Sequence, residues 1–311
     1  MQLYLPIAEL SLNLFMLVGL GGAVGFLSGL FGVGGGFLLT PMLIFSGIPA
    51  PVAVASVTGQ VVAASTSGAL SYWRRGGIDL KLALFLIVSG VCGAFGGVWT
   101  FGQLRSAGQL DLVISLGYLI FLGSIGSLML VEAVRSIIKH RQQGNPPPTK
   151  LPGKHTWVHG LPMRVRFKRS NLYVSIFPVI LIGGGIGFLG SLLGIGGGFI
   201  LVPALIYLLR VPGSIVIGTS LLQVLAIMAA TTILHAVNSQ TVDIVLAFTL
   251  MTGSVIGAQF GVSAGQYLRG DQLRALLAII VLAVALRFAL SLLLTPSDPF
   301  SVAVMTSVGG G

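Results

Sequence analysis

The sequence predicts an all-α polytopic membrane protein, a helical bundle made of two repeats. The chain has 311 residues, of which 55% are hydrophobic and only 8% charged, and its mean hydropathy is +1.01. A soluble domain has roughly 25% charged residues. Only helices and closed barrels satisfy the backbone in lipid, and long apolar runs without period-two alternation favour helices over a barrel.

A glycine-rich motif occurs twice. GFLSGLFGVGGGFLLTP at 25–41 returns as GFLGSLLGIGGGFILVP at 187–203, with eleven of seventeen positions identical. In each copy an apolar run ends at four glycines in five positions, and a second apolar run follows directly. Glycine tolerates positive φ and close approach of another backbone. Each glycine loop is therefore expected to separate the two helices of a broken or re-entrant pair.

Five apolar segments precede a polar stretch and five follow it. The expected segments are 10–31, 37–46, 51–72, 80–101 and 110–134, then 172–193, 199–209, 212–236, 242–264 and 273–294. The expected division is a first transmembrane repeat at 1–134, a basic linker at 135–171, a second repeat at 172–294 and a tail at 295–311. The chain begins MQLYLPIAELSLNLF, without lysine or arginine, so no removable signal peptide is expected.

The distribution of basic residues predicts that the two repeats are inverted. If the linker is cytoplasmic, counting crossings leaves all but two of the seventeen Lys and Arg residues inside, with Arg105 outside and Arg287 within the last segment. This agrees with the positive-inside rule and places both termini outside. Segments 37–46 and 199–209 are too short to cross, since about 20 residues are needed, so they are expected to be discontinuous helices.

The linker carries nine of the seventeen basic residues. Near its end, apolar Met163, Val165 and Phe167 alternate with basic residues, which predicts a short strand with one basic face. That face suits contact with anionic lipid headgroups, with a specific regulatory site as the alternative. The expected partners are the lipid bilayer and a small anionic substrate, with a homodimer kept open and no nucleic acid.

The glycine loops are the first candidate for a site. Each lies before a short helix, and a helix N-terminus has unpaired N–H groups that bind anions without a charged side chain. The alternative is that these glycines only let helices pack closely, which is the interpretation favoured for Gly93 and Gly97. The candidate residues in the loops are Gly34, Gly35, Gly36, Gly196, Gly197 and Gly198.

Polar residues near the start of two full crossings are the second candidate. They are Ser56, Thr58, Gln60, Thr219, Ser220 and Gln223, and the two glutamines align. A buried amide in lipid requires a hydrogen-bond partner, so these groups either contact substrate or join helices. His235 could titrate near neutral pH or serve as a packing residue.

The sequence disfavours catalysis. Asp79 and Asp243 start crossings and Glu132 ends one, so no acidic residue lies in the middle of a segment. A pump built on intramembrane carboxylates is therefore poorly supported. Metal-ligand clusters and nucleophile triads are missing as well, and the glycine loop follows no strand and lacks the lysine of a phosphate-binding loop. The chain is predicted not to be an enzyme and to use no cofactor or metal.

The doubled GxGGGF...P motif, the GTSLLQ run at 218–223 and the GAxxG turns resemble the sulfite exporter TauE/SafE family, also described as 4-toluene sulfonate uptake permeases. The resemblance implies an inner-membrane carrier for sulfur-containing anions such as sulfite, sulfoacetate or related organosulfonates. The first repeat departs from the family's run, reading ASVTGQ at 55–60.

Together, the repeats and the resemblance predict a secondary transporter. It would export a small sulfur-containing anion across the inner membrane by alternating access of the two repeats around the glycine loops. Two other classes remain open at this point. One is a membrane scaffold or assembly protein whose basic linker binds a partner. The other is an anion channel, since sequence does not separate gated conduction from alternating access.

Overall fold

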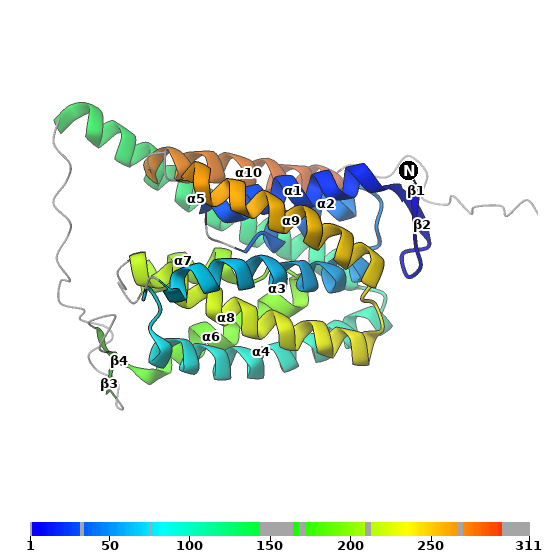
Figure 1. Ribbon diagram of the computed structural model, residues 1–311, viewed down its shortest axis with the longest axis horizontal. Helices are drawn as coiled ribbons and strands as arrows, with labels where there is room; N and C mark the ends of the chain where they lie inside the picture. Colours follow the sequence, from blue (N-terminus) through cyan, green and yellow to red (C-terminus); the bar gives the residue numbers. More distant parts are fainter. Residues whose placement is uncertain are drawn as a thin grey trace, which may run out of the picture.

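The protein is a bundle of helices that run roughly parallel to its longest axis (Figure 1). The computed structural model describes residues 2–31, 34–74, 76–143, 164–167, 172–208, 213–265 and 270–293. Within these ranges, eight helices are long and apolar enough to cross a membrane. The prediction of a polytopic helical membrane protein is confirmed.

The elements follow the repeat expected from the sequence. The first half contains β1 (Gln2–Leu5), β2 (Leu10–Asn13), α1 (Leu14–Phe31), α2 (Gly36–Phe45), α3 (Ala50–Arg74), α4 (Leu80–Ser106) and α5 (Leu110–Gln143). The second half contains β3 (Arg164–Phe167), β4 (Leu172–Ser175), α6 (Ile176–Leu193), α7 (Gly198–Tyr207), α8 (Gly213–Leu234), a π-helical turn (His235–Ser239), α9 (Ile244–Gly265) and α10 (Gly270–Leu293). Among the described residues, each half therefore has five α-helices, and the second in each is only ten residues long.

Two small antiparallel sheets add to the helices. The expected strand at the end of the linker is present as β3, which pairs with β4. The pairing of β1 with β2 was not expected, because residues from 10 onward were assigned to the first helical segment, although Leu10–Asn13 alternates between apolar and polar residues. This N-terminal hairpin packs on the bundle, where Asp243 Oδ2 accepts a hydrogen bond of 3.0 Å from the Ile7 N–H.

The fifth helix is longer than the sequence indicated. It was expected to end near residue 134, but α5 continues to Gln143, so its last turns belong to the expected linker. Helix-forming charged and polar residues follow the apolar stretch, and a rise of 1.5 Å per residue carries them beyond the membrane. Linker residues 144–163 and tail residues 295–311 lie outside the described residues.

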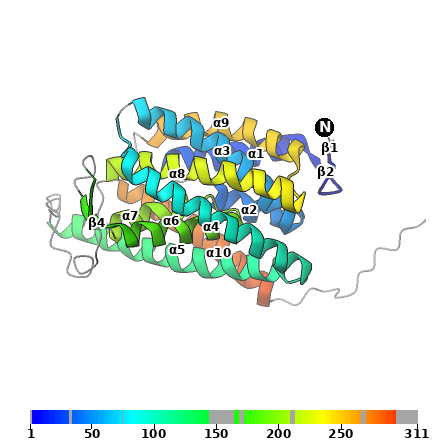
Figure 2. The same cartoon turned by 90° about the horizontal axis from the view of Figure 1, so that it is seen from below.

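Helices of one half pack against helices of the other. Helix α1 lies along α9, and the equivalent α6 lies along α4, while α3 packs on α8 and α5 on α10. Figures 1 and 2 both show α1 beside α9 and α4 beside α6. These contacts depend on glycine: a Cβ added at Gly93 or Gly257 would lie 2.0 Å from the carbonyl oxygen of Gly184 or Gly22. The packing interpretation of Gly93 is therefore confirmed.

Candidate functional site

The two glycine loops meet inside the bundle. A Cβ added at Gly36 would lie 2.7 Å from the carbonyl oxygen of Gly194, so only a residue without a side chain fits there. The rings of Phe37 and Phe199, which follow the two loops, stack with centroids 4.5 Å apart. Segments separated by 162 residues in the chain thus form one central feature.

Both short helices start at this meeting point in the same way. Their N-caps, Gly35 and Gly197, have φ of 70° and 72°, and no side chain caps either helix. Neither helix has an acidic residue in its first turn. The positive ends of two helix dipoles therefore lie close together without a protein anion to neutralise them, an arrangement that favours a bound anion.

The surroundings of the loops are mostly apolar, with one hydroxyl. Val61 of α3 and Val224 of α8 both lie within 4 Å of a Cβ added at Gly34. Ser65 Oγ lies 3.7 Å from the same point, is fully buried and has no hydrogen-bond partner among the described residues. Ser65 lies one helical turn after Val61, so both side chains face the loop from α3.

The second loop is tied to the first half by hydrogen bonds that sequence reasoning missed. The Tyr118 hydroxyl donates to the carbonyl of Leu193 at 2.8 Å, and Thr40 Oγ1 donates to the carbonyl of Gly194 at 3.4 Å. Tyr118 and Thr40 are fully buried. They belong to α5 and α2, so contacts between the halves fix the position of the second glycine loop.

Ser56 and Thr219 make equivalent contacts with the opposite half of the chain. Ser56 Oγ accepts a hydrogen bond of 2.9 Å from the Asp243 N–H, and Thr219 Oγ1 accepts one of 3.1 Å from the Asp79 N–H. Both aspartates in turn accept from a backbone N–H in the first turn of their own helix, which is N-capping. The two hydroxyls thus join α3 to the start of α9 and α8 to the start of α4.

Thr58 and Ser220 each donate a hydrogen bond to a carbonyl of their own helix, and Thr58 has a second partner in α8. Thr58 Oγ1 donates to the Ala55 carbonyl at 2.6 Å and accepts from Thr232 Oγ1 at 2.8 Å. Ser220 Oγ donates to the Ile217 carbonyl at 2.9 Å. In this conformation, Thr58 therefore links α3 to α8, whereas the Ser220 hydroxyl bonds within its own helix.

The two aligned glutamines have different environments. Gln60 Nε2 donates to Ser254 Oγ, and Ser254 Oγ donates to the Gly21 carbonyl at 3.1 Å, so Gln60 connects α3 with α9 and α1. Gln223 is also fully buried, but neither of its amide atoms has a partner among the described residues. The alignment of Asp79 with Asp243 explains this difference, because it places Gly90 at the position equivalent to Ser254.

His235 lies at the π-helical turn that follows α8. Its Nε2 is 3.0 Å from the Ser191 carbonyl, and since a carbonyl only accepts, Nε2 carries a hydrogen. The ring packs edge-on against Phe101 at 4.6 Å. These contacts support the packing interpretation, although Nδ1 has no partner among the described residues.

The crossing helices and the doubled glycine loop define a class, the polytopic helical membrane proteins. A model of the sulfite exporter TauE/SafE family matches residues 17–288, and the chain belongs to this family. It is a family of membrane transporters rather than of enzymes, as the sequence predicted.

Relatives agree with this assignment. A probable membrane transporter protein of Xylella fastidiosa (strain 9a5c) is 30% identical over 282 residues, which cover 88% of this chain and 94% of the relative. The probable membrane transporter protein YjnA of Bacillus subtilis (strain 168) is 28% identical over 85% of this chain and 95% of its own length. Sulfite exporter TauE/SafE family protein 3 of Arabidopsis thaliana is 28% identical, over 39% of this chain and 26% of its own length. No solved structure gives a significant match.

Proposed function

We propose that this membrane transporter exports a small sulfur-containing anion, such as sulfite or an organosulfonate, by alternating access around the paired glycine loops. The observation that carries the proposal is the meeting of two helix N-termini that no side chain caps, where Gly36 lies against the Gly194 carbonyl. Backbone N–H groups at helix ends stabilise an anion without binding it as tightly as a buried cation would. A carrier must also release its substrate, so such a site suits transport.

The contacts between halves support a two-fold repeat, and the distribution of basic residues in the sequence favours an inverted one. Equivalent helices exchange partners, since α1 packs on α9 where α6 packs on α4. The equivalent hydroxyls of Ser56 and Thr219 also reach across to equivalent aspartates of the opposite half. Two repeats related in this way can rock against each other around a fixed central site, as in other secondary transporters.

The proposed orientation has the linker in the cytoplasm and both termini outside, in the inner membrane. The N-terminal hairpin and the β3–β4 sheet lie at opposite ends of the bundle (Figure 1), which is consistent with this orientation. Labelling with a membrane-impermeant maleimide tests it in a Cys92→Ser background. Intact cells should be labelled at Gln109→Cys and protected at Arg74→Cys, and the reverse pattern would invert the orientation.

The side chains proposed to contact the anion differ in whether they already make hydrogen bonds within the protein. Ser65 and Gln223 have polar atoms without partners among the described residues, so a substrate oxygen can pair with them without breaking a hydrogen bond. The hydroxyls of Ser56, Thr58, Thr219 and Ser220 already make hydrogen bonds. We propose that they contact substrate only in a conformation in which their helices have moved.

Flux assays in proteoliposomes test the function. Labelled sulfite and organosulfonates should cross with saturable kinetics, and unlabelled anion on the far side should accelerate exchange, as expected of a carrier and not of a channel. Gly35→Leu combined with Gly197→Leu should abolish flux, because both positions have positive φ and face close neighbours. Gly123→Leu combined with Gly185→Leu is the matched control, since nothing lies within 4 Å of a Cβ added at either site.

Ser65→Ala provides a milder variant if the double leucine variant does not fold. It removes an unpartnered hydroxyl next to the loop and should raise the KM for sulfite with little effect on stability. Unchanged flux in both the folded glycine variant and Ser65→Ala would reject the site. Loss of function on deleting residues 143–160, with glycine variants that affect only stability, would instead favour the scaffold alternative.

A further inference from the structure

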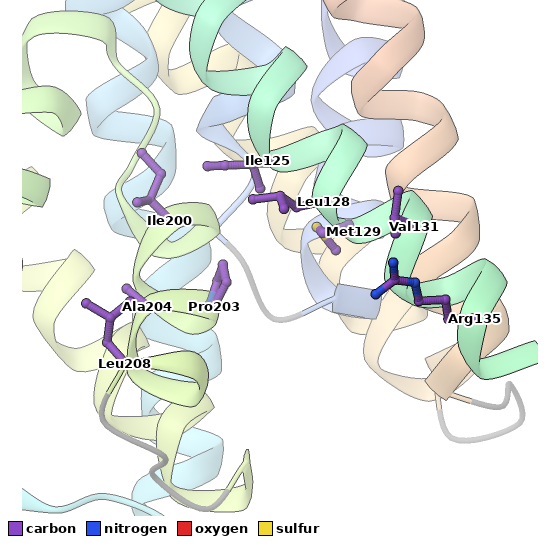
Figure 3. Close-up of a pocket in the computed structure, with 9 residues that line it drawn as sticks. All are labelled: Ile125, Leu128, Met129, Val131, Arg135, Ile200, Pro203, Ala204 and Leu208. Atoms are coloured by element: carbon purple, nitrogen blue, oxygen red, sulfur yellow. The ribbon is translucent and has the colours of Figure 1, made fainter. Parts of the chain in front are cut away.

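A cavity of about 600 Å³ separates α5 from α7. Figure 3 shows side chains of α5 facing side chains of α7 and Leu208 across the gap. Among its described lining residues, Arg135 is the one charged side chain and the others are apolar. The volume falls within the range of about 300–1,000 Å³ that is typical of small-molecule sites, so the cavity is large enough for a ligand.

This groove is accessible from the outer surface of the bundle. Leu128 and Val131 of α5 are 70% and 49% exposed, and Leu208, just after α7, is 57% exposed. The apolar membrane span of α5 runs from Leu110 to Val131, so these side chains face lipid tails in the membrane. The groove therefore opens sideways into the bilayer.

The equivalent gap in the other half is filled by the protein itself. Helices α2 and α10, which correspond to α7 and α5, are in contact. Phe45 of α2 packs against Phe288 of α10 with ring centroids 4.8 Å apart, and the Arg287 guanidinium carbon lies 5.5 Å from the centroid of Phe45. Phe45, with Arg287 over its ring, thus fills one gap, whereas the other gap is an apolar groove with Arg135 in its lining.

The depth of Arg135 indicates what the groove can hold. It follows the end of the apolar span of α5, at Val131, by four residues, which is about 6 Å along a helix. Arg135 therefore lies at the level of the lipid headgroups, while the apolar lining lies in the hydrocarbon layer.

We propose that the groove between α5 and α7 is a binding site for an anionic phospholipid, with one acyl chain between the helices and the phosphate on Arg135. Arginine presents N–H groups that pair with two phosphate oxygens at once. The sequence from 135 to 171 has nine of the seventeen basic residues of the chain. Because a basic segment at the membrane surface attracts anionic lipids, an anionic headgroup is favoured over a zwitterionic one.

Photo-cross-linking tests the site independently of transport. The purified full-length protein is reconstituted with phosphatidylglycerol or phosphatidylcholine that carries the same photoactivatable acyl chain, and labelled peptides are mapped. We expect phosphatidylglycerol to label 125–131 and 200–208 about fivefold more than phosphatidylcholine, the ratio that corresponds to about 1 kcal/mol per basic residue at an anionic surface.

Two variants and one control separate the effect of the Arg135 charge on lipid labelling from the effect of the apolar groove. Arg135→Gln should reduce phosphatidylglycerol labelling to the phosphatidylcholine level, whereas Arg74→Gln removes an exposed arginine outside the groove and should change nothing. Ala204→Trp fills the groove from α7 and should lower labelling by both lipids. If Ala204→Trp does not fold, Leu128→Trp fills the groove from α5 instead. Equal labelling by the two lipids in the unaltered protein, or labelling that survives both Arg135→Gln and the tryptophan variant, would overturn the proposal.

Discussion

Replacing each aligned glutamine by leucine should affect stability differently. Gln223 has two buried amide atoms without partners among the described residues, and a buried polar group left unpaired costs about 1–3 kcal/mol. Leucine is of similar size and has no polar atoms, so Gln223→Leu should stabilise the substrate-free protein by about 2 kcal/mol. Gln60→Leu removes the hydrogen bond to Ser254 together with the unpartnered Oε1, and these effects should cancel to within about 1 kcal/mol.

The assay is thermal unfolding of detergent-solubilised protein, followed by intrinsic fluorescence with and without sulfite. Substrate at 100 times its Kd stabilises a protein by about 2.7 kcal/mol. The wild-type protein and Gln60→Leu should show this stabilisation, and Gln223→Leu should lose most of it. A weaker response to ligand combined with greater intrinsic stability is the expected signature of a site residue.

A swap of side chains between the halves tests the explanation for the difference. A Cβ added at Gly90 would lie 2.2 Å from Ile227 Cδ1 and 3.3 Å from Gln223 Nε2, and the residue equivalent to Ile227 in the first half is Ala64. Gly90→Ser combined with Ile227→Ala therefore reproduces the arrangement around Gln60. The added serine should recover about 1 kcal/mol relative to Ile227→Ala alone, and only while Gln223 is present.

The reasoning would be refuted if Gln223→Leu destabilised the substrate-free protein by more than about 1 kcal/mol, the typical net value of one hydrogen bond. Such a loss would mean that the amide of Gln223 already has a partner, such as an ordered water. Full stabilisation of Gln223→Leu by sulfite would reject its role in binding while leaving transport itself untouched.

Four further substitutions test individual contacts. Tyr118→Phe removes the hydroxyl that donates to Leu193 and should destabilise the protein by about 1–3 kcal/mol, measured by the same unfolding assay, whereas an unchanged midpoint would show that the second glycine loop is not held by this bond. Ser56→Ala and Thr219→Val each remove one equivalent hydroxyl that accepts an aspartate N–H. They should destabilise by similar amounts, about 1 kcal/mol each, and strongly unequal losses would argue against equivalent roles. Gly93→Ala should destabilise, because the added Cβ meets the Gly184 carbonyl at 2.0 Å. Its control Gly102→Ala has open space and should stabilise by up to about 1 kcal/mol through helix propensity.

The sequence alone predicted the helices, their order and the two that are too short to cross. These features depend on the local pattern of apolar residues and on glycine, so they are visible without knowledge of packing. Predictions were weaker where local signals conflict. The second strand of the N-terminal hairpin, Leu10–Asn13, was taken as the start of the first helical segment, and α5 runs on to Gln143 because its polar end still consists of helix-forming residues.

The candidate site could be predicted only in part, because its contacts form between segments that are distant in the chain. The repeat identified both glycine loops, but whether they meet depends on how helices from the two halves pack. Tyr118 and Thr40 gave no sequence signal, because their hydrogen bonds reach carbonyls 75 and 154 residues away. Gln60 and Gln223 align perfectly in the sequence, and only the packing of α9 and α4 against them decides which amide has a partner.

The sequence by itself determined that this protein is a duplicated helical membrane protein of a transporter family, since composition, hydrophobic segments and the repeated motif are properties of the chain. The tertiary structure decided that the two glycine loops form one centre, that the two halves differ at Gly90 and Ser254, and that a groove remains open between α5 and α7. The physical reason is that hydrogen-bond partners and cavities arise between segments that are distant in the chain. Only the packing of the helices brings those segments together.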